Sequence, residues 1–183
     1  MSVLILRPNA DTATIEQTPS TGTTHYNLID EETKDEADYV MTDVYLGSTD
    51  IYGFPNHSSE TGSINSVTVK CYAKYILTGT TSRTVSIDPL VSIGGTTYLS
   101  GAQTVSDSVT LYSYTWSLNP NTSEAWTWTQ IDALLAGDKI IGGYTDKNNT
   151  KFVYCYQLWV EVDYTAAGGG VALPVFMFHY MNH

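Results

Sequence analysis

The sequence predicts an all-β protein: a jelly-roll-like β-sandwich with one short helix and an extended C-terminal arm. Only 15% of the 183 residues are charged, whereas 42% are hydrophobic and 14 are tyrosine. A chain rich in Thr, Tyr and Val favours half-buried pleated surfaces over helices. Alternating polar and apolar runs recur along the chain, separated by turns built on Gly, Pro and Asn. About eight to ten short strands at this regular spacing are typical of a sandwich or jelly roll.

The N-terminal third is expected to consist of short strands joined by irregular segments. Pro8 stops the first strand, and Gly47 interrupts the strand that follows a charged loop. In chain order the expected elements are a strand at 3–6, a Thr-rich irregular edge at 10–24, a charged loop within 26–40, a strand at 41–52 and a turn cluster at 53–62.

The remaining two thirds show clearer alternation, which predicts longer strands. Gly94 and Gly95 stand between two alternating runs, as in a β-hairpin turn. The Asn-rich segment at 146–150 is predicted as a second hairpin loop. The predicted strands are 64–77, 84–93, 96–99, 109–118, 139–144 and 151–164.

One short helix is predicted near residue 130. Thr129 and Asp132 have the spacing of a capping box, with Thr129 as the N-cap. Leu134 and Leu135 provide an apolar side, and Gly137 is the expected residue just beyond the C-terminus. At about two turns the helix is too short to be stable alone, so we expect it to pack across a sheet edge.

The chain divides into a folded body and an arm. Residues 1–165 are predicted to form the β-sandwich domain, 166–170 a Gly-rich hinge and 171–183 an apolar docking arm. Chain ends are usually polar, so a terminal strip rich in aromatic and aliphatic side chains indicates an interaction segment. The predicted partner-binding residues of the arm are Val171, Leu173, Val175, Phe176, Met177, Phe178 and Tyr180.

Charge and hydropathy argue against two classes of partner. The net charge is −11, and only eight Lys and Arg residues are available to neutralise phosphates, so we expect no nucleic-acid partner. No apolar run approaches the roughly 20 residues of a membrane-spanning helix, and Pro174 interrupts the arm. The N-terminal segment lacks the charged region of a secretory signal. We therefore expect a soluble chain that folds in the cytoplasm without a membrane partner.

The two cysteines are predicted to be free thiols. Alternation in the strand at 67–75 directs Cys71 into the core. The better core face of the strand at 152–164 consists of Tyr154, Tyr156, Leu158, Val160 and Val162. That choice places Cys155 on the opposite face, and opposed faces exclude the Cβ separation of about 4 Å that a disulfide requires.

A set of short motifs resembles a known group of proteins. The motifs are, in order, Leu6-Arg-Pro-Asn9, Thr18-Pro-Ser20, Asp30-Glu31, Asp38-Tyr-Val40, Ile64-x-x-Val67, Gly94-Gly-Thr-Thr-Tyr98, Asn119-Pro120, Trp126-Thr-x-x-Gln-Ile-Asp-Ala-Leu-Leu-Ala-Gly137 and Val160-Glu-Val-Asp-Tyr164. Across residues 4–164 the chain resembles small jelly-roll proteins encoded among the virion structural genes of tailed bacteriophages. The resemblance implies a virion component, provides no catalytic residues and does not cover the arm.

Three groups of polar residues contain side chains that occur in metal or catalytic sites. The acidic loop at 30–38 has the oxygen ligands that Ca²⁺ prefers, but it matches no EF-hand and is explained as a solvated loop. Glu161 and Asp163, about 7 Å apart on one strand face, have a spacing relevant to glycosidases, yet an outward polar face explains them equally well. His179 and His183 would share a metal only in a helix. We predict no catalytic residue, metal or cofactor.

The aromatic residues allow a different kind of site. Four tryptophans and fourteen tyrosines would suit a sugar-stacking platform, with Trp159 and Tyr112 as the candidate glycan-binding residues. The same residues would equally fill a core or a subunit interface, where Tyr and Trp are enriched.

Together these observations lead us to expect a non-enzymatic virion structural protein, a capsid decoration or cement protein. It would dock through its arm onto the capsid protein or another copy of itself, and form a homo-oligomer. The alternative is a glycan-binding adhesion module of a phage tail or fibre.

Overall fold

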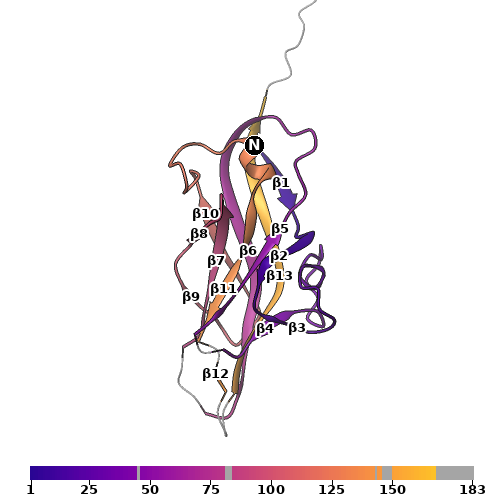
Figure 1. Ribbon diagram of the computed structural model, residues 1–183, viewed down its shortest axis with the longest axis vertical. Helices are drawn as coiled ribbons and strands as arrows, with labels where there is room; N and C mark the ends of the chain where they lie inside the picture. Colours follow the sequence, from indigo (N-terminus) through magenta and orange to yellow (C-terminus); the bar gives the residue numbers. More distant parts are fainter. Residues whose placement is uncertain (45, 81–83, 143, 146–149, 168–183) are drawn as a thin grey trace, which may run out of the picture.

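The chain folds into two antiparallel β-sheets that pack face to face as a sandwich (Figure 1). The computed structural model describes residues 1–44, 46–80, 84–142, 144–145 and 150–167. The predicted arm at 171–183 and its partner-binding residues lie outside the described residues. The all-β prediction is confirmed.

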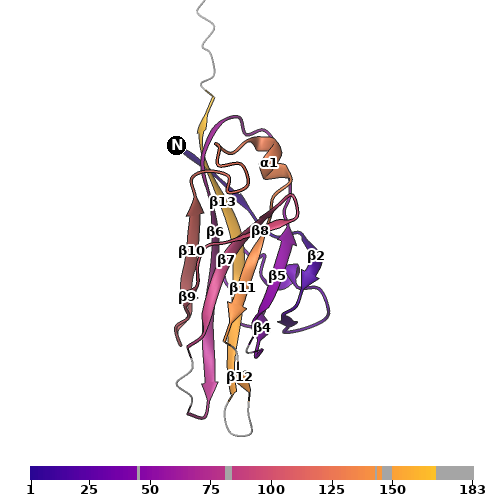
Figure 2. The same cartoon turned by 60° about the vertical axis from the view of Figure 1, so that its left-hand side comes forward.

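The larger, seven-stranded sheet has the order β10-β6-β13-β4-β3, with β1 and β12 also paired to β13. Its strands are β1 (Ser2–Leu6), β3 (Thr18–Pro19), β4 (Val40–Thr42), β6 (Gly62–Thr78), β10 (Thr110–Trp116), β12 (Tyr144–Thr145) and β13 (Thr150–Ala166). Strands β6 and β13, of 17 residues each, form its long central pair (Figure 2).

The smaller, six-stranded sheet has the order β2-β5-β11-β7-β8, with β9 paired to β7. Its strands are β2 (Ala10–Ile15), β5 (Ser48–Gly53), β7 (Ser86–Ile93), β8 (Thr96–Leu99), β9 (Gln103–Thr104) and β11 (Leu135–Ile141). The helices are a 3-10 turn, η1 (Tyr26–Leu28), and α1 (Trp128–Asp132).

The strand order is that of a jelly roll. If β4, β5, β6, β7, β8, β10, β11 and β13 are numbered one to eight in chain order, one sheet reads 1-8-3-6 and the other 2-7-4-5. Apart from the β7–β8 hairpin, which stays within one sheet, consecutive strands of these eight alternate between the sheets in the pattern of two Greek keys. The short strands β1, β2, β3, β9 and β12 extend this body at its edges.

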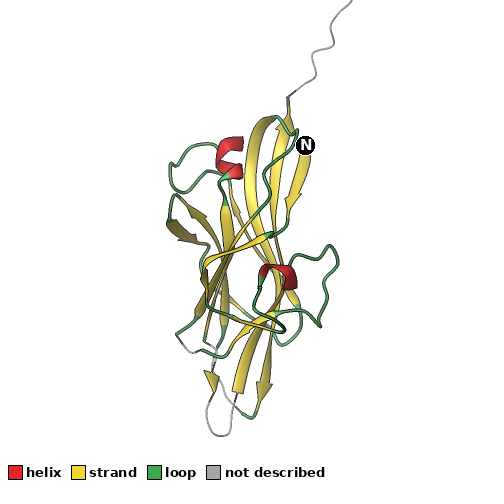
Figure 3. Cartoon of the chain, turned by 45° about the vertical axis from the view of Figure 1, so that its right-hand side comes forward, coloured by secondary structure: helices red, strands yellow, loops and turns green. Residues whose placement is uncertain are grey.

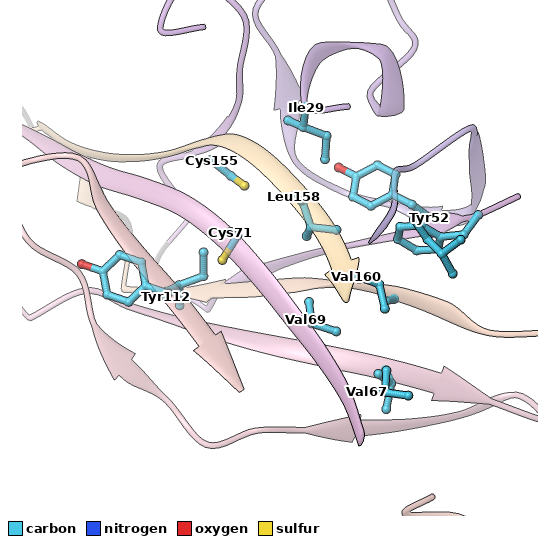
Figure 4. Packing of buried hydrophobic residues seen from close by; sticks show 14 of the residues in the cluster. Ile29, Tyr52, Val67, Val69, Cys71, Tyr112, Cys155, Leu158 and Val160 are labelled. Atoms are coloured by element: carbon cyan, nitrogen blue, oxygen red, sulfur yellow. The ribbon is translucent and has the colours of Figure 1, made fainter. Parts of the chain in front are cut away.

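The core lies between the inner faces of the two sheets (Figure 4). Alternation in β6 directs Val67, Val69 and Cys71 inward, and all three are fully buried. Opposite them, the inner positions of β11 include the fully buried Ala136 and Ile140. Strand β11 begins at Leu135, four residues before the predicted start.

A β-bulge at Tyr156 explains why one predicted face of β13 was wrong. Cys155 lies opposite Ala73 of β6, whereas Gln157 lies opposite the very next residue, Tyr72. One extra residue reverses which alternate positions face the core. After the bulge the inward residues are Leu158, Val160 and Val162, as predicted; before it they are Val153 and Cys155, and not Tyr154.

Cys155 therefore lies in the core, on the same side as Cys71 (Figure 4). Both cysteines are buried free thiols. The predicted oxidation state is confirmed, but the placement of Cys155 on the opposite face was wrong.

The short helix exists, two residues earlier than predicted. Thr127 is the N-cap: its hydroxyl accepts the Gln130 N–H, and the Gln130 side chain accepts the Thr127 N–H. Gly137 does not follow the helix but lies inside β11. A side chain at Gly137 would place its Cβ 1.8 Å from the Asp50 carbonyl oxygen, so close strand packing explains this glycine.

Candidate functional site

The solvent-facing side of the seven-stranded sheet, called here the outer face, carries an unusual set of side chains. Alternation in β6, β10 and β13 turns every second residue away from the core. The outer face includes Val3 and Ile5 of β1, Lys70, Tyr72, Lys74 and Ile76 of β6, Leu111 of β10, and Phe152, Tyr154, Trp159 and Glu161 of β13.

Trp159 is the centre of the first group on the outer face. Its indole N–H donates to Glu161 Oε1 at 3.0 Å, and its ring centroid lies 5.7 Å from that of Tyr72. Lys70 Nζ lies 2.8 Å from Glu161 Oε2 and 5.9 Å from the Trp159 ring. This arrangement holds the half-buried indole in one orientation beside a charged pair.

The charges in this group are paired, because the Lys70 ammonium lies beside the Glu161 carboxylate. Burial would raise the pKa of Glu161, but hydrogen bonds from Lys70 and Trp159 outweigh it and hold this pKa below its ordinary value. Glu161 is therefore ionised at neutral pH and paired. Asp163, the second carboxylate considered with Glu161 on this strand face, accepts a hydrogen bond from the Asn65 side chain.

Three tyrosines form the second group, beside the bulge. Tyr154 and Tyr156 stack nearly parallel, with ring centroids 6.0 Å apart. Tyr39 meets both edge-on, at 4.8 and 6.0 Å. Lys74 Nζ lies 5.2 Å from the Tyr156 ring and 2.9 Å from Glu36 Oε2. The bulge creates this group because it places Tyr156 near two tyrosines on the outer side.

Glu36 belongs to the acidic loop predicted at 30–38, and two lysines pair with its carboxylate. Hydrogen bonds from Lys34 and Lys74 lower the pKa of Glu36 to about 2. This carboxylate of the loop thus pairs with lysines. Among the residues that the structure describes, no three His, Cys, Asp or Glu side chains are arranged to hold a metal ion.

Aliphatic side chains flank the two aromatic groups. Val3 and Ile5 are 55% and 50% exposed, and Ile76 and Leu111 are 42% and 41% exposed. Strand β1 places Ile5 opposite Glu161 and Val3 opposite Asp163. Exposed aliphatic and aromatic side chains on one sheet face are the composition of a protein interface.

The two predicted glycan-binding residues have different surroundings. Trp159 lies on the outer face. Tyr112 points into the core opposite Cys71, is only 6% exposed and accepts the Ser106 N–H through its hydroxyl at 2.7 Å. Tyr112 therefore offers no stacking surface, and its assignment was wrong. His179, His183 and residues 146–149, part of the predicted hairpin loop, lie outside the described residues.

A buried polar cluster between the sheets was not predicted. Asp50 of β5 accepts the backbone N–H groups of Glu16 and Gln17 through Oδ1, and its Oδ2 contacts His25 Nδ1 at 2.7 Å and the Tyr52 hydroxyl at 2.9 Å. These contacts attach the segment between β2 and η1 to the sandwich.

The second acid of this buried cluster is Asp138 of β11. Its Oδ2 accepts the Gln17 amide at 2.8 Å, while its Oδ1 and Gln17 Oε1 are buried with no hydrogen-bond partner among the described residues. Burial, aggravated by the charge of Asp50, raises the pKa of Asp138 to about 8. Asp138 is therefore mainly protonated at neutral pH. A protonated carboxyl group can donate as well as accept a hydrogen bond, whereas an ionised one only accepts.

Comparison with known proteins does not narrow the assignment. The chain matches no protein-family model and no curated protein. Within the described residues no helix is long and apolar enough to cross a membrane.

Proposed function

We propose that the chain is a non-enzymatic virion structural protein of a tailed phage, a capsid decoration protein that oligomerises and binds its neighbours by surface burial. The observation that carries this proposal is the outer face, where exposed aliphatic side chains flank two ordered aromatic groups. The jelly-roll strand order supports it, because this architecture recurs in viral capsid domains.

The outer face suits a protein partner. Tyr72 and Trp159 are the residue types that dominate binding energy at interfaces, and the ion pairs of Lys70 and Lys74 satisfy the charges that docking would desolvate. The predicted arm at 171–183 adds a second attachment point in this proposal. Two linked contacts repeated over a capsid lattice would give high avidity from individually weak interactions.

The experiment is an add-back of purified chain to virions that lack it, with bound copies counted by quantitative mass spectrometry. We expect Tyr72→Ala/Trp159→Ala to reduce occupancy at least tenfold. The control is Tyr98→Ala, which removes a half-buried tyrosine from the other sheet. Equal occupancy for all three proteins would refute docking through the outer face. Full occupancy after deletion of 168–183 would refute docking through the arm.

A glycan-binding adhesion module is the alternative, and the Trp159 group favours it specifically. A half-buried indole beside Lys70, Tyr72 and Glu161 combines a stacking surface with hydrogen-bonding groups. A glycan array separates the two functions. Sugar binding that survives deletion of 168–183 and Tyr98→Ala, and is lost with Trp159→Ala, would favour the adhesion module.

A further inference from the structure

Strand β1 is an edge strand with one side unpaired. Among the described strands it pairs only with β13, from Ser2 opposite Tyr164 to Leu6 opposite Val160. Apart from that ladder, the backbone of Ser2–Leu6 makes no hydrogen bond to the described residues. Figure 3 shows β1 below the N label, on the right of the upper half of the molecule.

Edge strands normally carry a feature that prevents pairing with another chain, such as a charge, a proline, a bulge or very short length. The segment Ser2–Leu6 has no charged residue and no proline, and its register with β13 is regular. Two other edges of the same sheet are protected. Strand β3 has only two residues and contains Pro19, and the Ser113 carbonyl of β10 accepts the Gln103 side-chain amide at 3.2 Å.

The space beside β1 is open at its C-terminal end. A hollow of about 690 Å³ is lined there by Ile5, Arg7, Pro8, Asn9, Glu32 and Pro55. A second strand added at this edge would therefore find room at the end where the chain turns away.

We infer that β1 is a homodimer interface, at which the same strand of a second copy adds antiparallel to it and joins the two seven-stranded sheets. A two-fold axis that passes through Leu4 perpendicular to the sheet pairs the five residues Ser2–Leu6 with the same five residues of the second copy. The outer faces of both copies then lie on the same side of the joined sheet. Val3 then lies opposite Ile5 of the partner, and Leu4 opposite itself. The pairing is self-complementary, as a two-fold interface requires, and β-branched pairs are favourable across strands.

Charge argues for a second copy at this particular edge. Two chains of net charge −11 repel each other, so they need a contact from which charge is excluded. Within the sheet the nearest acidic rows are those of Glu161 and Asp163, one strand behind β1, while the hollow at its end is lined by one acid and one base, Glu32 and Arg7. Across the proposed dimer these rows are three strand spacings apart, about 14 Å, which exceeds the Debye length at physiological salt. Lys70 also neutralises Glu161.

This inference is independent of the virion proposal, because it rests on β1 alone. Its first test is sedimentation velocity of the full chain from 1 to 200 μM. We expect the mass to approach twice the chain mass of 20.1 kDa. Val3→Lys/Ile5→Lys should weaken dimerisation at least tenfold, whereas Ile76→Lys/Leu111→Lys, on the same face but far from β1, should leave it unchanged. Circular dichroism checks that each variant is folded.

The second test identifies the register. A Val3→Cys chain mixed with an Ile5→Cys chain should form a disulfide-linked heterodimer in oxidised glutathione, faster than either variant links to itself. A wild-type chain that is monomeric at every concentration would overturn the inference. So would a dimer unaffected by the β1 lysines, or cross-linking with no preference for the mixed pair.

Discussion

Asp50 and Asp138 lie directly opposite each other on β5 and β11, and both side chains are completely buried between the sheets. Asp50 has four hydrogen-bonding contacts to its carboxylate, whereas Asp138 has one. Asp138, the acid with fewer partners, has its pKa raised by burial first and by the neighbouring Asp50 second, which keeps it mainly neutral.

The buried pair makes stability depend on pH. Because the pKa of Asp138 is raised from 3.8 to about 8 in the folded state, the folded chain binds a proton that the unfolded chain releases between these values. The free energy of unfolding should therefore fall by about 1.4 kcal/mol per pH unit from this group as pH rises toward 8. Asp138→Asn should remove that slope, so its stability relative to wild type should rise with pH.

Denaturant titrations of wild type and variant from pH 5.5 to 8.5 measure this difference. Asp107→Asn, at an exposed position, is the matched control and should leave the slope unchanged. Parallel curves for wild type and Asp138→Asn would show that Asp138 is not protonated in the folded chain.

The two core thiols should be inert in the folded protein. A hydrogen bond to Cys71 and burial hold the pKa of Cys155 well above its ordinary range, and the thiolate is the reactive form. Titration with a thiol reagent should detect no cysteine in native protein and two in denaturant. Rapid reaction of Cys155 under native conditions would favour the outward placement that alternation had indicated.

The helix cap can be tested with two neighbouring threonines. Thr127→Ala removes the hydroxyl that accepts the Gln130 N–H, leaves the Thr127 backbone N–H in place, and should lower the free energy of unfolding by about 1 kcal/mol. Thr129→Ala, at the N-cap position that sequence spacing had indicated, should change it by less than about 0.5 kcal/mol. Thermal denaturation of both variants distinguishes the two caps, and a larger loss at Thr129 would contradict the structure.

Gly137 should be among the least replaceable residues of the sandwich. An added Cβ would lie 1.8 Å from the Asp50 carbonyl oxygen, so β5 and β11 would have to separate. We expect Gly137→Ala to cost about 3 kcal/mol or more in denaturant titrations. At Gly53 the nearest atom would be 3.4 Å away, so Gly53→Ala is the control and should be tolerated. Similar stability of both variants would argue against the close approach of the strands.

Alternation predicted the sandwich well where strands are regular. It placed Val67, Val69 and Cys71 in the core, because β6 is paired without interruption through this stretch. It failed at β13, since no local pattern marks the extra residue at Tyr156 that reverses the inward face. The bulge is fixed by pairing with β6, and that pairing is a long-range property.

For the candidate sites, too, the sequence predicted some positions correctly and missed others. Trp159 was placed on the surface by alternation, and the structure agrees. Tyr112, the other glycan-binding candidate, is buried, because it shares the inward row of β10 with Trp116 while Leu111 of the other row is exposed. Asp138 was detectable in principle, since Ala136, Asp138 and Ile140 share one face. Asp138 becomes one of two facing buried acids because β11 pairs with β5 and so places it opposite Asp50. Alternation within one strand does not predict which strands pair.

Cryo-electron microscopy of virions incubated with a Fab against the purified chain tests the capsid assignment most directly. The virions would come from the phage whose genome encodes the chain. We predict Fab density at regularly repeated positions over the capsid shell. Fab density confined to the tail, or purified virions that do not contain the chain, would contradict the proposal.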